Sequence, residues 1–230
     1  MKKKLSRKEV ARYLAYKNHL PDRQVGAIID ACEKELFEEL TPRCIGQRFS
    51  LNTLSFESKD LKRHLKDAED AWLCVLTLGT EADLLLRRWS FENMAKAAVG
   101  QACCAVMSDQ YLDFYMQELQ EKSAEGEYLL PPFSPGYGDF SLSFQRRILD
   151  LTEAGKRLGV YLTSAGMLVP EKTVTAVIGI STQEEEACRA SCIHCGKTDC
   201  AFRRESAAET EEDRSEERRV GKECRSRWSP

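Results

Sequence analysis

The chain has 230 residues, of which 42% are hydrophobic and 31% are charged. This length and apolar content suffice for one domain with a real core and a small appendage. The net charge of −3 and the pI near 5.8 argue against a polyanion such as nucleic acid as the partner. No apolar run reaches the length of a membrane helix, and no signal peptide follows the basic N-terminus, so we expect a cytoplasmic protein without a membrane partner.

The first third of the chain is expected to alternate helices with strands. Ser6 and Glu9 have the spacing of a capping box, which predicts the start of a helix. A second helix is expected from Asp22 to Pro42, because apolar residues recur there at helical spacing. We expect a strand at 43–51, a short helix at 58–66 and a buried strand at 71–78.

Two further helices and several strands are expected downstream. Ser90 can cap a long helix running to about Gln120, whose small residues allow close packing. The remaining expectations are a helix at 142–158 and strands at 127–130, 160–163 and 173–180. Because no regular βαβ repeat is present, we predict an α+β fold: a single domain with a twisted, mostly antiparallel sheet covered by helices.

Residues 133–139, Phe-Ser-Pro-Gly-Tyr-Gly-Asp, place one proline and two glycines around a tyrosine. Pro135 fixes its own φ, and Gly136 and Gly138 accept positive φ at no steric cost, which predicts a rigid, sharp turn. Since the backbone on both sides of Tyr137 carries no side chain, a ligand can approach it closely. From the loop alone, an ordinary tight turn with a half-buried tyrosine remains the alternative interpretation.

Composition divides the chain into three regions. Residues 1–182 form the expected folded domain, and 183–205 are a cysteine-rich C-terminal appendage. Residues 206–230 are mostly charged and are expected to be disordered, because they cannot bury enough apolar surface to offset their ordering entropy. Within them, 214–230 resemble a translated adapter sequence and are expected to be non-native.

The chain contains ten cysteines, and without an export signal we expect thiols or metal ligands rather than disulfides. Four of them form a compact C-x3-C-x2-C-x4-C cluster: Cys188, Cys192, Cys195 and Cys200. Four thiolates hold either a zinc ion or an iron–sulfur cluster, and the spacing matches no standard pattern for either. Incidental thiols or a surface redox pair are the alternatives. Four other cysteines are expected to be small core residues: Cys32, Cys74, Cys103 and Cys104.

The loop and the segments after it resemble the activation domain of cobalamin-dependent methionine synthase, in particular a free-standing bacterial version that carries an SPGYGD loop. The most specific parts are the loop itself and the strand Lys172–Gly179. The resemblance spans residues 5–204. Within this span, five further segments match in pattern: 7–14, 76–79, 149–151, 159–163 and 167–171. The resemblance implies the α+β fold of that domain.

The resemblance also implies an activity. Members of this family restore a corrinoid cofactor that has slipped to cobalt(II): one electron makes cobalt(I), which S-adenosylmethionine then methylates. The cobalamin would be carried by a partner, a methionine synthase or another corrinoid methyltransferase, and a flavodoxin or ferredoxin would supply the electron. The chain would thus be an accessory domain of a methyltransferase in methionine biosynthesis, with no catalytic residue of its own.

On this resemblance, the loop residues Ser134, Pro135, Gly136 and Tyr137 bind the S-adenosylmethionine. Backbone groups of Ser134 and Gly136 would contact the ligand, and the Tyr137 ring would pack on its sulfonium. The family carries an arginine two residues before the serine, which should pair with the ligand carboxylate, whereas this chain has Pro132 there.

Lys172 or Arg146 is a candidate to replace that arginine. Asp139 is expected to cap the helix that follows the loop, although it could instead face the cofactor.

Two other interpretations stay open. In the first, the chain is an iron–sulfur or zinc redox protein that transfers electrons to a corrinoid protein, and its S-adenosylmethionine site is degenerate; Pro132 favours this. In the second, it is a small regulatory binding domain with structural zinc. Of the two metal centres, the iron–sulfur cluster is slightly favoured over zinc. The reason is an association: the activity that the resemblance implies consumes electrons.

Overall fold

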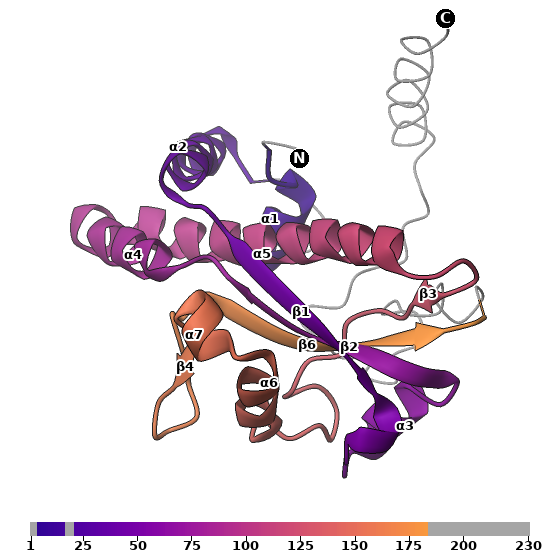
Figure 1. Ribbon diagram of the computed structural model, residues 1–230. Helices are drawn as coiled ribbons and strands as arrows, with labels where there is room; N and C mark the ends of the chain where they lie inside the picture. The colour runs from indigo at the N-terminus through magenta and orange to yellow at the C-terminus, as the bar shows by residue number, and fades with distance from the viewer. Residues whose placement is uncertain (1–3, 17–20, 184–230) are drawn as a thin grey trace, which may run out of the picture. The chain divides into compact units, whose positions relative to one another are not determined.

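The computed structural model describes residues 4–16 and 21–183. The predicted α+β class is confirmed: a curled antiparallel sheet in the order β1-β2-β6-β3 is covered by helices on both faces (Figure 1). Its strands are β1 (Arg43–Ser50), β2 (Ala68–Thr77), β3 (Tyr128–Leu129) and β6 (Thr173–Ser181). A separate two-stranded sheet pairs β4 (Tyr161–Leu162) with β5 (Leu168–Val169).

Two groups of helices cover the sheet. One face carries α1 (Arg7–Tyr13), α2 (Arg23–Glu39), α4 (Thr80–Glu92) and α5 (Met94–Lys122). The other carries α3 (Lys59–His64), α6 (Phe144–Thr152) and α7 (Ala154–Leu158), with the 3-10 turn η1 (Leu51–Thr53) nearby. Figure 1 shows α5 on one side of the sheet and α6 and α7 on the other.

The central strands β2 and β6 are buried on both faces, because successive side chains of a strand point to opposite sides. Leu76 of β2 packs with α2, α4 and α5, whereas Val75 packs with α3 and α6. In β6, Ile178 packs with the C-terminal part of α5 and Val177 with the α6 side. Any site on one face is therefore separated from the other face by a packed sheet.

Several helix starts agree with their capping signals. The Oγ of Ser6 accepts the N–H of Glu9 at 3.4 Å, and the Oδ1 of Asp22 accepts the N–H of Val25 at 2.9 Å. Each bond satisfies an N–H that lacks a partner within the first helical turn.

The four cysteines expected in the core are indeed at most 1% exposed: Cys32, Cys74, Cys103 and Cys104.

The predicted helix start at Ser90 is wrong. Ser90 lies inside α4, a helix that the sequence analysis did not predict, and α5 begins after Asn93. The side-chain oxygen of Asn93 accepts the N–H groups of Ala95 and Lys96 at 2.9 and 3.3 Å. The backbone of Asn93 is extended, with φ of −159°, and this breaks the helical run into two.

The predicted helix at 142–158 is also divided. Glu153 has a φ of 53°, in the left-handed region, and separates α6 from α7. The strand expected at 160–163 is the short β4, which pairs with β5 and not with the main sheet.

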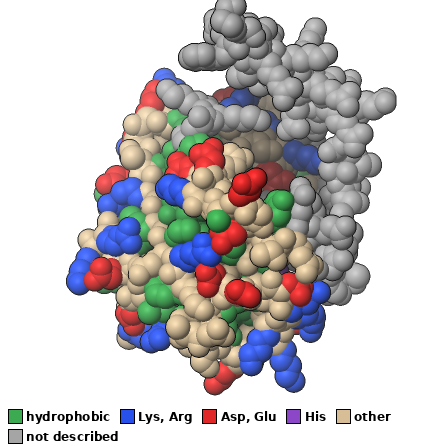
Figure 2. All heavy atoms as spheres, turned by 45° about the vertical axis from the view of Figure 1, so that its right-hand side comes forward, with side chains coloured by type: hydrophobic (Ala, Val, Ile, Leu, Met, Phe, Trp, Pro, Cys, Tyr) green, Lys and Arg blue, Asp and Glu red, His purple; other side chains and the backbone are tan. Residues whose placement is uncertain are grey.

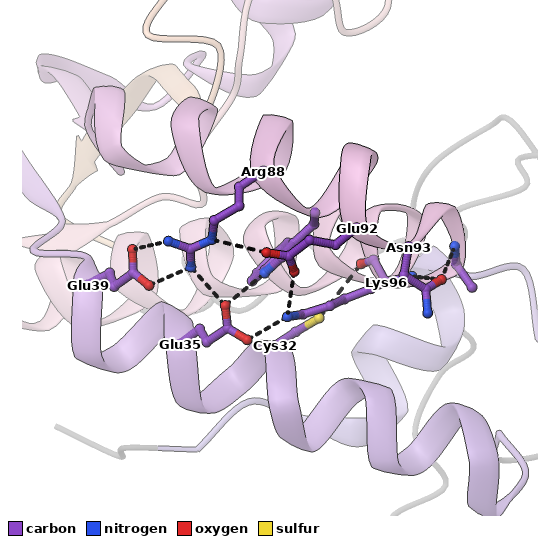
Figure 3. Close-up of polar contacts among 9 residues, drawn as sticks. Cys32, Glu35, Glu39, Arg88, Glu92, Asn93 and Lys96 are labelled. Carbon is purple, nitrogen blue, oxygen red and sulfur yellow. Dashed lines mark hydrogen bonds and ion pairs between the residues drawn. The ribbon is translucent and has the colours of Figure 1, made fainter.

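A network of charges joins α2 to α4 and α5 (Figure 3). Glu35 accepts hydrogen bonds from the indole N–H of Trp89 at 2.8 Å, from Lys96 at 2.6 Å and from Arg88 at 2.9 Å. Arg88 also donates to Glu39 at 2.6 Å.

None of the described helices is both long enough and apolar enough to cross a bilayer.

Candidate functional site

The loop of residues 133–140 leaves the main sheet beside β6. Phe133 and Val177 exchange two backbone hydrogen bonds, each of 2.9 Å. The chain then folds back on itself: the N–H of Gly136 donates to the carbonyl of Phe140 at 2.7 Å, and the N–H of Phe140 donates to the carbonyl of Tyr137 at 2.9 Å. The loop is thus closed by its own backbone.

The tip of this loop is open to solvent. Pro135 is buried and anchors the turn, whereas Gly136, Tyr137 and Gly138 are exposed. Gly136 and Gly138 have φ values of 97° and 53°, as their positions in a sharp turn required. Tyr137 is 59% exposed, more than the half-buried tyrosine of an ordinary turn, and a ligand can reach it from outside.

An aromatic cluster supports the ring of Tyr137. Phe133 contacts it edge-on, with 6.0 Å between ring centroids, and Phe133 also contacts Phe140 at 6.1 Å. Phe140 and Phe56 each lie 5.1 Å from Phe144, the first residue of α6. Such offset and edge contacts are favourable, so the tyrosine stands on a packed base.

Asp139 was expected to cap the helix that follows it, and it does not. Its carboxylate instead accepts hydrogen bonds at the start of α3, from the hydroxyl of Ser58 and from the N–H groups of Lys59 and Asp60 at 2.8 and 3.1 Å. These bonds, the one from Ser58 foremost, lower the pKa of Asp139. In return, the carboxylate of Asp60 accepts the N–H of Asp139 at 3.2 Å.

Sequence reasoning missed the part that His64 plays beneath the loop. Its Nε2 lies 2.8 Å from the carbonyl oxygen of Pro131, and its ring lies 5.2 Å from that of Phe133. Burial lowers the pKa of His64, and the bond to Pro131 opposes the shift only in part. No sequence signal relates residues that are 67 positions apart.

The two candidate replacements for the missing arginine lie on different faces. The carbonyl of Lys172 accepts the N–H of Leu78, and residues opposite one another in an antiparallel pair share a face. Leu78 packs with α4 and α5, so Lys172 belongs to the face away from the loop. Arg146 is exposed on α6, two residues after Phe144, and is on the loop's side of the sheet.

A groove lies on the opposite face, between α2 and α5. Its two hollows, of about 370 and 440 Å³, share Phe37 and Tyr111. These residues pack with the core on the α5 side, whereas the loop packs with the α6 side. The groove and the loop are therefore separate features.

The predicted metal ligands Cys188, Cys192, Cys195 and Cys200 lie outside the described residues. Within residues 4–16 and 21–183, no three or more His, Cys, Asp or Glu side chains are grouped so that they could hold a metal ion.

On the face shown in Figure 2, acidic and basic side chains are interspersed.

Comparisons with known proteins bear on the fold of this chain. No protein-family model and no curated protein matches this chain. Among solved structures, the fold is similar to the crystal structure of the MetH reactivation domain bound to AdoHcy, with a TM-score of 0.53 and 13% sequence identity. The match covers 68% of this chain and 64% of that one, so this chain spans less than two thirds of its length. At this identity the likeness concerns the fold.

Proposed function

We propose that this chain is a reactivation module. It binds S-adenosylmethionine and supports the reductive methylation of a cobalt(II) corrinoid on a partner methionine synthase or corrinoid methyltransferase. The observation that carries the proposal is the open loop around Tyr137, which stands on a packed aromatic base in a fold similar to that of a domain solved with AdoHcy bound.

The ligand contacts follow from the groups that the loop leaves available. The N–H groups of Gly136 and Tyr137 are already donated within the loop, to Phe140 and Ser134. A carbonyl oxygen keeps a second lone pair when it accepts one bond, so the backbone offers the ligand acceptors. Carbonyl oxygens and the face of an aromatic ring both attract a cation. The sulfonium of S-adenosylmethionine fits this set.

The chain's task in the reaction is orientation. An electron from a reductant such as a flavodoxin or ferredoxin turns cobalt(II) into cobalt(I). The cobalt electron pair then forms the bond to the methyl carbon as the carbon–sulfur bond breaks, and neutral S-adenosylhomocysteine leaves without any proton transfer. Since no acid or base is required, a rigid loop that holds the methyl group in line suffices, and orientation alone can lower a barrier by about 7–11 kcal/mol in ideal cases.

The carboxylate of the ligand needs a cationic partner. Pro132 cannot supply one, and Lys172 lies on the far face of the sheet. We therefore assign this role to Arg146, which is exposed on the loop's side.

The experiment is a reconstitution. The protein is mixed with a cobalt(II) corrinoid methionine synthase that lacks an activation domain of its own, a reductant and S-adenosylmethionine, and the visible spectrum is followed. The proposal expects methylcobalt to accumulate only when both the protein and S-adenosylmethionine are present. Methylcobalt formation at the same rate without the protein would refute it.

The second candidate is the redox protein whose active part is the cysteine cluster. The replacement of the expected arginine by Pro132 favours it, because that change weakens the case for the ligand site. Purification without oxygen separates the metals: an iron–sulfur cluster gives a coloured protein with iron and sulfide, whereas structural zinc gives a colourless one.

A further inference from the structure

We infer that Asp139 and Asp60 form a reciprocal clamp which fixes the orientation of Tyr137 toward its ligand. Both aspartates are therefore positioning residues of the loop. The inference rests on the proposed function for the identity of the ligand, but the clamp itself is visible without one.

The clamp joins two segments that lie about 80 residues apart in the sequence. The Asp139 carboxylate accepts the N–H of Lys59 at 2.8 Å and the N–H of Asp60 at 3.1 Å, and it also accepts the hydroxyl of Ser58. The Asp60 carboxylate accepts the N–H of Asp139 at 3.2 Å. The carboxylate and the backbone N–H of Asp139 are thus both bound to α3. Together these bonds fix the position and the orientation of Asp139.

The clamp acts two residues from the ring that contacts the ligand. On one side of Tyr137, the N–H of Gly136 is bound to the carbonyl of Phe140. On the other side, Gly138 leads directly to the clamped Asp139. The short span between two fixed points leaves the tyrosine backbone little freedom, and the edge contact with Phe133 supports its ring from below.

Gly138 is required for this close approach. A Cβ atom at Gly138 would overlap the carboxylate of Asp60. Gly138 also has a φ of 53°, which Asn or Asp adopts at moderate cost. Contact with Asp60 is therefore the stronger reason for glycine at this position.

Capping of α3 does not by itself explain the arrangement. The Oγ of Ser58 accepts the N–H of Leu61 at 2.9 Å, and the Asp139 carboxylate accepts two other N–H groups of the first turn. The bond from the N–H of Asp139 to the Asp60 carboxylate satisfies no helix N–H, so capping does not account for it. Leu61 is fully buried and anchors the helix in the core. The bonds to Asp139 add a tie between an anchored helix and an exposed loop, and what they restrain is the loop.

The test compares clamp variants with matched controls elsewhere in the protein. Asp139→Ala removes the clamp, Asp139→Asn keeps part of its acceptor capacity, and Gly138→Ala displaces Asp60. Asp22→Ala removes an exposed helix cap from α2, far from the loop in the sequence. Gly126→Ala introduces a side chain at a φ of 83° where no atom lies within 4 Å.

Three quantities are measured on each full-length variant. They are the hydrogen-exchange rates of the Gly136 and Phe140 amides without ligand, the affinity for S-adenosylmethionine, and the methylation rate of the cobalt at saturating S-adenosylmethionine. A residue that only stabilises the fold changes the unfolding temperature but not the rate at saturation.

We expect Asp139→Ala and Gly138→Ala to speed exchange of both amides and to lower the affinity and the saturated rate about tenfold. Asp139→Asn should recover part of each, and both controls should match the wild type. Unchanged amide exchange in Asp139→Ala, or equal effects in Asp22→Ala, would overturn the inference. If the wild type binds no S-adenosylmethionine, the proposed function and the ligand role of the clamp both fail, whereas exchange still decides whether the clamp exists.

Discussion

The ammonium of Lys96 on α5 lies 2.6 Å from the carboxylate of Glu35 on α2 (Figure 3). Both side chains are largely covered, with 18% and 25% exposure. Glu35 also accepts bonds from Trp89 and Arg88 on α4. One carboxylate therefore holds together three helices on the face of the sheet opposite the loop.

We predict that Glu35→Gln lowers the free energy of unfolding by about 1–2 kcal/mol, because charged donors lose their ionised acceptor in a largely covered site. Glu38→Gln is the matched control on the same helix. Glu38 is 61% exposed and has only a 4.0 Å contact with Lys34, so its change should stay within about 0.5 kcal/mol. Urea unfolding at neutral pH measures both, and equal losses would contradict the assignment.

The same carboxylate gives a pH dependence. Partial burial acts to raise the pKa of Glu35, but hydrogen bonds from Lys96, Trp89 and Arg88 outweigh it and lower the pKa to about 2. An unfolded glutamate titrates near about 4.3, so the stabilisation is complete above about pH 5 and is lost as the pH falls toward about 2. The stability difference between wild type and Glu35→Gln should thus shrink between about pH 5 and pH 2, as unfolding at several pH values would show.

Two helical glycines should respond to alanine with opposite signs. A Cβ at Gly100 of α5 would overlap the Trp89 ring of α4, so Gly100→Ala should destabilise the protein by about 1–3 kcal/mol. Gly26 of α2 has nothing within 4 Å of its added Cβ, and Gly26→Ala should stabilise by about 0.5–1 kcal/mol. Thermal unfolding of the pair is the measurement. A stabilising Gly100→Ala would show that α4 and α5 pack less closely than described.

Tyr137→Ala should weaken S-adenosylmethionine binding about tenfold, since a cation over an aromatic ring is stabilised by about 1–2 kcal/mol. Because Tyr137 is exposed, the unfolding temperature should change by less than about 2 °C. Tyr137→Phe should retain most of the affinity. Tyr161→Ala serves as control, since Tyr161 is 60% exposed and lies in β4. Comparable affinity losses in the control would rule out a specific role for Tyr137.

Pro132→Arg should strengthen S-adenosylmethionine binding about tenfold, because a second guanidinium would add two parallel hydrogen bonds to the carboxylate that Arg146 otherwise holds alone. Pro132→Ala separates the effect of losing the proline from that of gaining the charge. Calorimetry on both variants decides the matter. An affinity that does not differ between arginine and alanine would place the carboxylate elsewhere.

Much of the fold could be predicted because its signals are local. Capping residues such as Ser6 and Asp22 contact N–H groups three positions away, and the alternating apolar residues of β6 reflect its own geometry. The break at Asn93 was missed for a related reason: Ser90 is an equally good cap by composition. The close approach of Trp89 in α4 to Gly100 in α5 is a tertiary contact that composition does not reveal.

The supports of the loop could not be predicted, because they are distant in sequence. Local rules assigned Asp139 to the next helix, yet it binds the start of α3. His64 reaches the loop through Pro131 and Phe133, which no spacing announces. The turn itself was predictable, since proline and glycine determine backbone conformation directly.

Calorimetric titration of the wild-type protein with S-adenosylmethionine tests the account most directly. We predict saturable binding of one ligand per chain, competed by S-adenosylhomocysteine and weakened in Tyr137→Ala but not in Tyr161→Ala. An absence of heat up to millimolar S-adenosylmethionine, from a protein shown to be folded, would contradict it.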